Sequence, residues 1–289
     1  MRTLFRFSLL MILPLFVLRT ADVLMNVDVT TGFFAAQTGG LFWGAGLALL
    51  ALAAVLLALK NRKAYLRFAP ASPSFLGALL LAVTGILIEI GSFGMLLNVI
   101  QQPGFEYRHL FISRVELFAL GVTSIHFRME FWCALLGILL IGWIFLWIAW
   151  RVGHGELAKA PVLFCLPVVW FAMRAVCDYT IAPINPHDNM ILTRLIADLL
   201  LALFYLRYAR AISLGRQQNH LRGLAPYALL AGGFMLAFKL PLLFLASQFS
   251  PSDVLLIAAE AVAAAAAFVL ADHSLKEREK VIYAETKNF

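Results

Sequence analysis

The sequence predicts an all-α bundle of about eight transmembrane helices, and three observations support that fold class. The chain has 289 residues, of which 62% are hydrophobic and only 13% are charged. Its mean hydropathy is +0.88, whereas soluble domains carry about 25% charged residues. Long apolar runs recur along the whole chain, and basic residues gather between alternate runs. These features exclude a water-soluble domain, and they exclude a disordered chain, which would need low hydrophobicity.

Eight apolar segments are long enough to cross a bilayer, which takes about 20 residues per helix. They lie at 4–26, 40–59, 75–100, 129–150, 160–182, 190–212, 224–249 and 253–272. The first segment begins like a signal peptide. However, Arg19 and Asp22 stand where small residues would mark a cleavage site. We therefore expect the first segment to be an uncleaved span.

Turn-forming residues separate these segments. Pro70 and Pro73 lie before the third segment, and Pro183 and Pro186 follow the fifth. The sequence Ser-Pro-Ser-Asp over 250–253 precedes the eighth and provides a helix N-cap. Each predicted span is thus bounded by residues that end helices or start them.

The distribution of Lys and Arg predicts the orientation. With both termini in the cytoplasm, 16 of the 23 basic residues lie in cytoplasmic segments, three lie outside, and four lie within spans. Basic residues favour cytoplasmic loops, so both termini are predicted to be cytoplasmic in a plasma membrane. The same bias explains the net charge of +7 without a nucleic-acid partner.

We expect one transmembrane domain over 1–273 and a cytoplasmic tail over 274–289. The first and fifth spans share a pattern in which Leu-Pro is followed by Arg and then Asp. A four-span duplication would give halves 1–150 and 151–273 of parallel orientation, as in some transporters.

The long outer connection contains an amphipathic stretch over 105–121 that is too charged to span and too apolar for a free loop. This composition is typical of a helix at the membrane interface. Two interpretations remain open: a helix lying on the bilayer surface, and a partly re-entrant helix that covers something beneath it.

Nine ionisable residues interrupt the apolar segments, and they are the candidate ligand-binding residues. A charge at the centre of a membrane helix costs roughly 2.5–3.5 kcal/mol on insertion scales, so these side chains should face the bundle interior. Counted along their helices, all lie in the outer half of the membrane or near its midplane. The nine are Arg19, Asp22, Glu89, Arg174, Asp178, Arg194, Asp198, Lys239 and Glu260.

The spacing of these residues predicts pairs. Arg174 with Asp178 and Arg194 with Asp198 stand four residues apart, and Arg19 with Asp22 stands three apart, so each pair can form along one helix. Glu89 and Lys239 have no such partner. Their matched depths predict that they pair across the bundle.

Two functions fit this pattern. In the first, the residues line an outward-facing chamber that binds or transports a small charged or zwitterionic solute, or relays protons. The arginines would hold a carboxylate or phosphate, Glu89 and Glu260 would bind a cation or titrate, and Pro241 would let its helix bend. In the second, the charges form a structural ion-pair network in a membrane interaction or assembly subunit.

Catalytic and metal-binding motifs are missing from the sequence. It contains no zinc-protease, serine-hydrolase, phosphate-loop, dinucleotide-binding or EF-hand pattern. We therefore expect no enzyme activity, no cofactor and no metal, and a membrane-embedded enzyme is the weakest interpretation. The expected partners are the lipid bilayer and a small charged solute.

Two short stretches carry a family resemblance. They are Asp-Val-Thr-Thr-Gly-Phe-Phe at 28–34 and Trp-Phe-Ala-Met-Arg at 170–174. With Asn185 and the Leu- and Phe-rich sixth span, they resemble a group of bacterial multi-spanning membrane proteins of unknown function. The resemblance implies a bacterial integral membrane protein, and it implies no activity.

Overall fold

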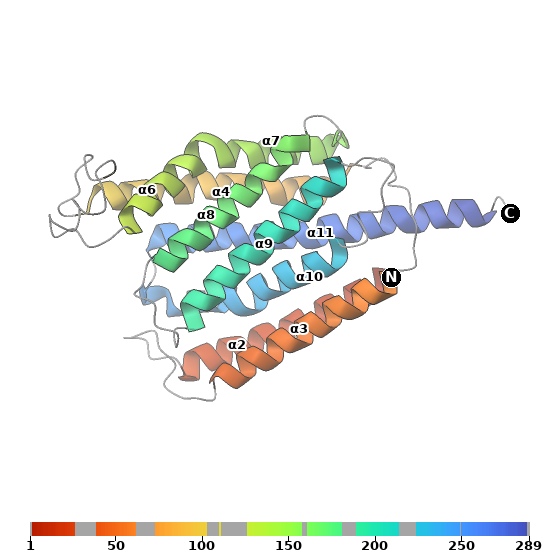
Figure 1. Cartoon of the computed structure of the whole chain (residues 1–289), viewed down its shortest axis with the longest axis horizontal. Coiled ribbons are helices and arrows are strands. Elements are labelled where there is room, and N and C mark those ends of the chain that lie inside the picture. The colour runs from red at the N-terminus through yellow and green to blue at the C-terminus, as the bar shows by residue number, and fades with distance from the viewer. Residues whose placement is uncertain are drawn as a thin grey trace.

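The computed structural model describes residues 2–26, 39–61, 73–102, 110, 126–157, 161–180, 189–213, 224–248 and 250–287. All regular secondary structure in these ranges is helical (Figure 1). The α-helices are α1 (Arg2–Leu10), α2 (Ile12–Asn26), α3 (Gly39–Asn61), α4 (Phe75–Ile100), α6 (His126–Leu136), α7 (Gly142–His154), α8 (Leu166–Thr180), α9 (Asn189–Ser213), α10 (Leu224–Phe234) and α11 (Pro251–Lys287).

Short segments of other helix types connect several of these helices. The π-helix η2 (Gly137–Ile141) joins α6 to α7, and the 3-10 helix η3 (Pro161–Cys165) leads into α8. After α10 come the π-helix η6 (Met235–Lys239) and the 3-10 helix η7 (Leu240–Gln248). Joined in this way, the described elements form eight helical segments, which correspond to the eight predicted apolar runs.

Six of the described helical segments are long and apolar enough to cross a membrane. Of the other two, α3 is apolar over Trp43–Leu59, the part of it whose side chains are described, and α9 carries Arg194 and Asp198 in its first half. The chain therefore fits a protein that crosses a membrane several times. Eight crossings with cytoplasmic termini remain the prediction.

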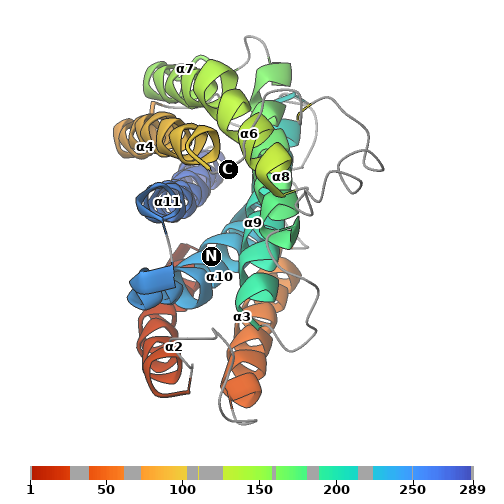
Figure 2. The same ribbon diagram turned by 90° about the vertical axis from the view of Figure 1, so that its left-hand side faces the viewer.

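The bundle has two layers of helices, seen nearly end-on in Figure 2. One layer holds α7, α4, α11, α10 and α2 in that order, and the other holds α8, α9 and α3. A hydrogen bond of 3.1 Å from the Trp43 indole to Thr193 links α3 to α9. The start of α1 and the end of α11 lie at the same end of the bundle (Figure 1).

Glycines allow α4 to pack closely on its antiparallel neighbours. A Cβ atom at Gly91 would meet Leu256 of α11, and one at Gly85 would meet the backbone of α7 at Gly142. Small residues let helix backbones approach in membranes, where van der Waals contact replaces the hydrophobic effect as the attraction between helices. The aromatic rings of Phe145, Phe171 and Tyr205 fill the space between the layers. The rings of Phe171 and Tyr205 are stacked, with their centroids 5.4 Å apart.

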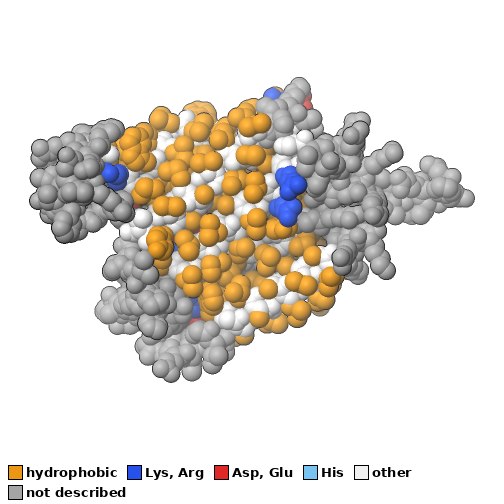
Figure 3. Space-filling view, viewed as in Figure 1, with side chains coloured by type: hydrophobic (Ala, Val, Ile, Leu, Met, Phe, Trp, Pro, Cys, Tyr) orange, Lys and Arg blue, Asp and Glu red, His pale blue; other side chains and the backbone are white. Residues whose placement is uncertain are grey.

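The described surface is apolar where the helices would contact lipid. Figure 3 shows hydrophobic side chains across the middle of one face, with Lys and Arg near the helix ends. Leu139 and Trp143 expose 67% and 64% of their surface, which suits contact with acyl chains.

Two sequence predictions concern the ends and loops. The predicted tail from 274 continues α11 without a break as far as Lys287. The predicted interfacial helix over 105–121 lies outside the described residues except for Leu110, which is buried with Val99 beside Phe131.

Candidate functional site: a buried cluster of charges

Six of the nine predicted residues meet in one place, which we call the charge cluster: Arg174, Asp178, Arg194, Asp198, Lys239 and Glu260. Four elements supply them. Helices α8 and α9 each contribute an Arg and an Asp one turn apart, η6 contributes its last residue, and α11 contributes the Glu. By their positions along the helices, these residues lie toward the end of α8 and the first halves of α9 and α11. That end of the bundle is opposite the chain termini (Figure 1).

Lys239 holds carboxylates from three elements. Its Nζ lies 2.6 Å from Asp198 Oδ1, 2.6 Å from Glu260 Oε2 and 3.6 Å from Asp178 Oδ2. An ammonium group has three N–H donors, so one lysine can serve all three acids. The side chain thereby ties η6 to α8, α9 and α11.

The two arginines complete the network. Arg194 donates to both oxygens of Asp178, from Nη2 at 2.6 Å and from Nε at 3.1 Å. Arg174 Nε donates to Glu260 Oε1 at 3.2 Å, and its Nη2 lies 3.8 Å from Asp178 Oδ1. Three cations thus face three carboxylates, which makes the cluster formally neutral. Arg194 holds Asp178 with the forked donor geometry that a lysine lacks.

The cluster is almost completely sealed. Five of its side chains expose 1% of their surface or less, and Arg194 exposes 10%. Solvent therefore reaches little of the cluster except at Arg194. Where the sequence predicts an outward-facing chamber, the described residues form a buried network of charges, and the chamber stays a prediction.

A local change of helix type positions Lys239. Pro241 has no N–H, and its ring would clash with the carbonyl four residues earlier, so an α-helix cannot run through it unchanged. The chain responds with the π-turn of η6, in which the Leu240 N–H donates to the Met235 carbonyl, followed by the 3-10 helix η7. Such single π-turns are frequent at functional sites.

Arg19 and Asp22 pair on their own helix, as predicted. Arg19 Nη1 lies 2.5 Å from Asp22 Oδ2, and both side chains expose only 2% of their surface. Asn26 donates to the other Asp22 oxygen at 2.8 Å. Helix α2 packs against η6 and η7, so this pair lies beside the element that carries Lys239.

The predicted pairing of Glu89 with Lys239 is wrong. Lys239 is bonded to Asp198 and Glu260, whereas Glu89 lies on the face of α4 that packs against Gly142 at the start of α7. Its Oε1 is buried and has no hydrogen-bond partner among the described residues. Matched depth along two helices does not fix the direction in which each side chain points.

The partners of Arg194 and Asp198 also lie across helices. Arg194 bonds to α8 through Asp178, and Asp198 bonds to η6 through Lys239. Spacing within one helix identified these residues as charged pairs, but packing between helices decided their strongest contacts.

A second polar feature, at the other end of the bundle, was missed by the sequence analysis. Arg2 and Arg6 of α1 both bind Asp272 of α11, beside a pocket of about 490 Å³. The signal was present, because Arg2 and Arg6 stand one turn apart on a single helix face.

The described residues contain no group of three His, Cys, Asp or Glu side chains arranged to hold a metal ion. Of the features behind the family resemblance, the stretch 28–34 and Asn185 lie outside the described residues. The stretch 170–174 holds the buried Trp170 and Phe171 and the cluster residue Arg174.

Comparison of the chain with protein-family models, with curated proteins and with solved structures gives no match. The resemblance to bacterial membrane proteins of unknown function therefore stays a prediction. On sequence and fold, the chain is a multi-helical protein of membrane-spanning character with a buried network of charges.

Proposed function

We propose that the protein is a membrane transporter for a small charged or zwitterionic solute, with the charge cluster as its binding and gating centre in a closed state. One observation carries the proposal. Lys239, at the end of a π-turn, holds carboxylates from α8, α9 and α11. A solute that takes one of those contacts weakens the link between several helices at once.

The chemistry of the cluster supports exchange with a solute. Ionisable residues inside membrane segments are costly and are commonly found on substrate or ion pathways. In the closed state each cation is neutralised by a carboxylate of the protein. A carboxylate or phosphate of a solute can replace Asp178 at the guanidinium of Arg194, and the displaced Asp178 keeps its contacts with Arg174 and Lys239.

Arg194 is the proposed point of entry, because it is the cluster side chain with the largest exposed fraction, 10%. It lies near the start of α9, so a solute arriving from that end of the bundle would meet it first. With both termini in the cytoplasm, as the Lys and Arg distribution predicts, that end faces outward. The function we propose is binding and movement of a solute, without catalysis.

A thermal-shift experiment tests the binding step. The purified protein would be heated with L-glutamate, inorganic phosphate or glycine betaine, which represent a carboxylate, a phosphate and a zwitterion. We expect at least one of them to raise Tm, because a ligand that binds only the folded state stabilises it. Arg194→Lys should abolish the shift, since a lysine cannot hold an oxyanion with two parallel bonds.

Arg207→Lys is the matched control. Arg207 is on the same helix and donates to Tyr227 at 2.9 Å, away from the cluster, so this variant should keep the ligand shift. Uptake of the stabilising solute into proteoliposomes should follow the same pattern. The binding proposal fails if no probe shifts Tm, or if the two variants lose the shift equally.

The second candidate function is a membrane assembly subunit in which the cluster is structural, and the observation that favours it is the seal around five of the six side chains. Buried ion networks can often be replaced by uncharged side chains of similar size without loss of stability. A neutral variant tests this: Arg174→Met, Asp178→Asn, Arg194→Met, Asp198→Asn, Lys239→Met and Glu260→Gln together. A structural cluster predicts that this variant folds and keeps its partners, whereas a transporter predicts that it folds without uptake.

A further inference from the structure

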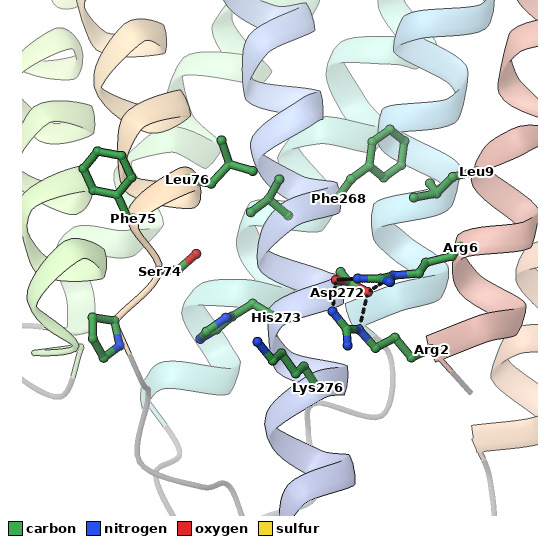
Figure 4. Close-up of a pocket in the computed structure, with 12 residues that line it drawn as sticks. Arg2, Arg6, Leu9, Ser74, Phe75, Leu76, Phe268, Asp272, His273 and Lys276 are labelled. Atoms are coloured by element: carbon green, nitrogen blue, oxygen red, sulfur yellow. Dashed lines mark hydrogen bonds and ion pairs between the residues drawn. The ribbon is translucent and has the colours of Figure 1, made fainter.

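A pocket of about 490 Å³ opens at the bundle end where the chain starts, opposite the charge cluster. Three elements enclose it: α1, the first turn of α4 and the last apolar turns of α11 (Figure 4). The proposed transport function does not involve this pocket. Its lining includes Arg2, Arg6, Phe75, Asp272 and Lys276.

Positive charge is in excess at the pocket. Both Arg2 and Arg6 bind the carboxylate of Asp272 in a forked arrangement, with the four N–O distances between 2.8 and 3.0 Å. Lys276 lines the same space from one turn further along α11. Three cations therefore face one carboxylate, and a guanidinium carries five N–H donors, more than a single carboxylate uses.

The other wall of the pocket is apolar. Phe75 and Leu76, at the start of α4, expose 81% and 53% of their surface, and Phe268 of α11 and Leu9 of α1 add further apolar lining. Figure 4 shows the phenyl ring of Phe75 and the side chain of Leu76 on the opposite side of the pocket from the two arginines. A free inorganic anion gains nothing from such a surface. An amphiphile with an anionic head and hydrocarbon chains would use both walls.

The pocket lies at the level where lipid headgroups are expected. The apolar run of α11 gives way to charged residues from Lys276 onward, and the α4 span begins at Phe75. The first turn of a helix also favours negative charge, because the helix dipole is positive there. Basic pockets between membrane helices on the cytoplasmic side bind lipid head groups, and the predicted orientation places this end in the cytoplasm.

We propose that this pocket is a binding site for the phosphate headgroup of an anionic membrane lipid. The arginines and Lys276 hold the phosphate, and the acyl chains run along Phe75 and Leu76. The occupant then bridges α1, α4 and α11, of which α1 and α11 are already linked by the Arg2 and Arg6 bonds to Asp272 on one side of the pocket.

Binding would be measured as the Tm of the full chain in detergent with added dioleoyl phosphatidylglycerol, dioleoyl phosphatidylcholine or inorganic phosphate. We expect the anionic lipid to raise Tm, and we expect neither the zwitterionic lipid nor phosphate at the same concentration to do so. Arg6→Gln and Lys276→Gln should each weaken the apparent affinity for the anionic lipid about fivefold, since one basic residue near anionic lipid is worth about 1 kcal/mol. Arg6 is 56% exposed, so its replacement should leave the fold intact.

Arg210→Gln is the matched control, because Arg210 is exposed in the last turn of α9 and is outside the pocket lining. It should leave the affinity for the anionic lipid unchanged. Phe75→Ser should weaken binding of the dioleoyl lipid through loss of the apolar wall. The proposal is overturned if Arg210→Gln weakens binding as much as the pocket variants, if the zwitterionic lipid binds equally well, or if inorganic phosphate alone reproduces the full shift.

Discussion

The charge cluster and the Arg2–Arg6–Asp272 site use the same chemistry in opposite surroundings. Both pair guanidinium groups with carboxylates in forked contacts of similar length. The cluster is neutral and sealed, whereas the second site has an excess of cations and exposes 23% of Asp272 and 56% of Arg6. Burial, rather than geometry, should therefore decide how much each pair contributes to the free energy of unfolding. Removing one partner of a buried pair leaves an unpaired charge in a low dielectric.

The largest expected effect comes from Lys239→Met. The change leaves three buried carboxylates facing two arginines, and breaking a buried ion pair by removing one partner costs about 3–5 kcal/mol. Unfolding in mixed micelles would measure the loss. Adding Asp198→Asn to the same chain restores neutrality and should recover most of the stability. If Lys239→Met alone unfolds like the wild type, the cluster does not hold these helices together.

A smaller loss is expected from Arg194→Lys. The charge remains, but the two bonds to Asp178 cannot both be made by an ammonium group in the same place. A hydrogen bond to a charged group contributes about 1.5–3 kcal/mol, which sets the expected destabilisation. The same substitution at Arg207, whose partner is the neutral Tyr227 hydroxyl, should cost less. Equal losses at the two positions would show that burial of the ion pair is unimportant.

Glu89 is intermediate between the two regions, because it is half-buried and one of its oxygens is sealed against Gly142. A Cβ atom at 142 would overlap the Glu89 carboxyl group, so Gly142→Ala should destabilise the protein by about 1–3 kcal/mol, a usual range for overpacking. Adding Glu89→Ala should remove that loss. Gly44→Ala is the control, since nothing lies within 4 Å of its added Cβ, and it should be neutral or slightly stabilising in thermal unfolding.

The smallest effect is expected from Asp272→Asn. Asp272 exposes 23% of its side chain and Arg6 56%, so salt screens these partly exposed pairs far more than the sealed ones. Surface ion pairs contribute about 0.2–1 kcal/mol, so the change should lower Tm less than the losses above, and less still at 1 M NaCl. The loss caused by Lys239→Met should be nearly independent of salt, since its partners are sealed from solvent. If the stability loss of Lys239→Met depended strongly on salt, or that of Asp272→Asn did not depend on it, the contrast between a sealed and a solvent-accessible site would be wrong.

The sequence predicted the helices well because hydropathy is a property of each segment alone. Every predicted apolar run overlaps a described helical segment, and the ends at Phe75, Ile100 and Leu224 agree to the residue. Charges within those runs correctly indicated a buried network, because lipid does not accept them. Arg174 and Asp178 were placed on one face by their spacing alone.

What the sequence could not supply was rotation of each helix about its axis. Depth along the span is fixed by counting residues, but the partner of Lys239 depends on how η6, α9 and α11 pack. Matched depth alone pairs Glu89 with Lys239, but the rotation of α4 turns Glu89 toward Gly142. The pocket near Arg2 was missed because it joins residues from the two ends of the chain, and local patterns do not detect such contacts.

Helix α11 is 37 residues long, roughly 55 Å at 1.5 Å per residue, against a hydrocarbon core of about 30 Å. It carries Glu260 at one level and Asp272 at another before it projects past the other helices (Figure 1). The stretch from Glu260 to Lys287 is one continuous helix of roughly 40 Å, so a tilt of about 10° at Glu260 would displace its far end by about 7 Å. A fluorescent label on the last turn of α11 would therefore report a small rearrangement at Glu260 as a much larger displacement.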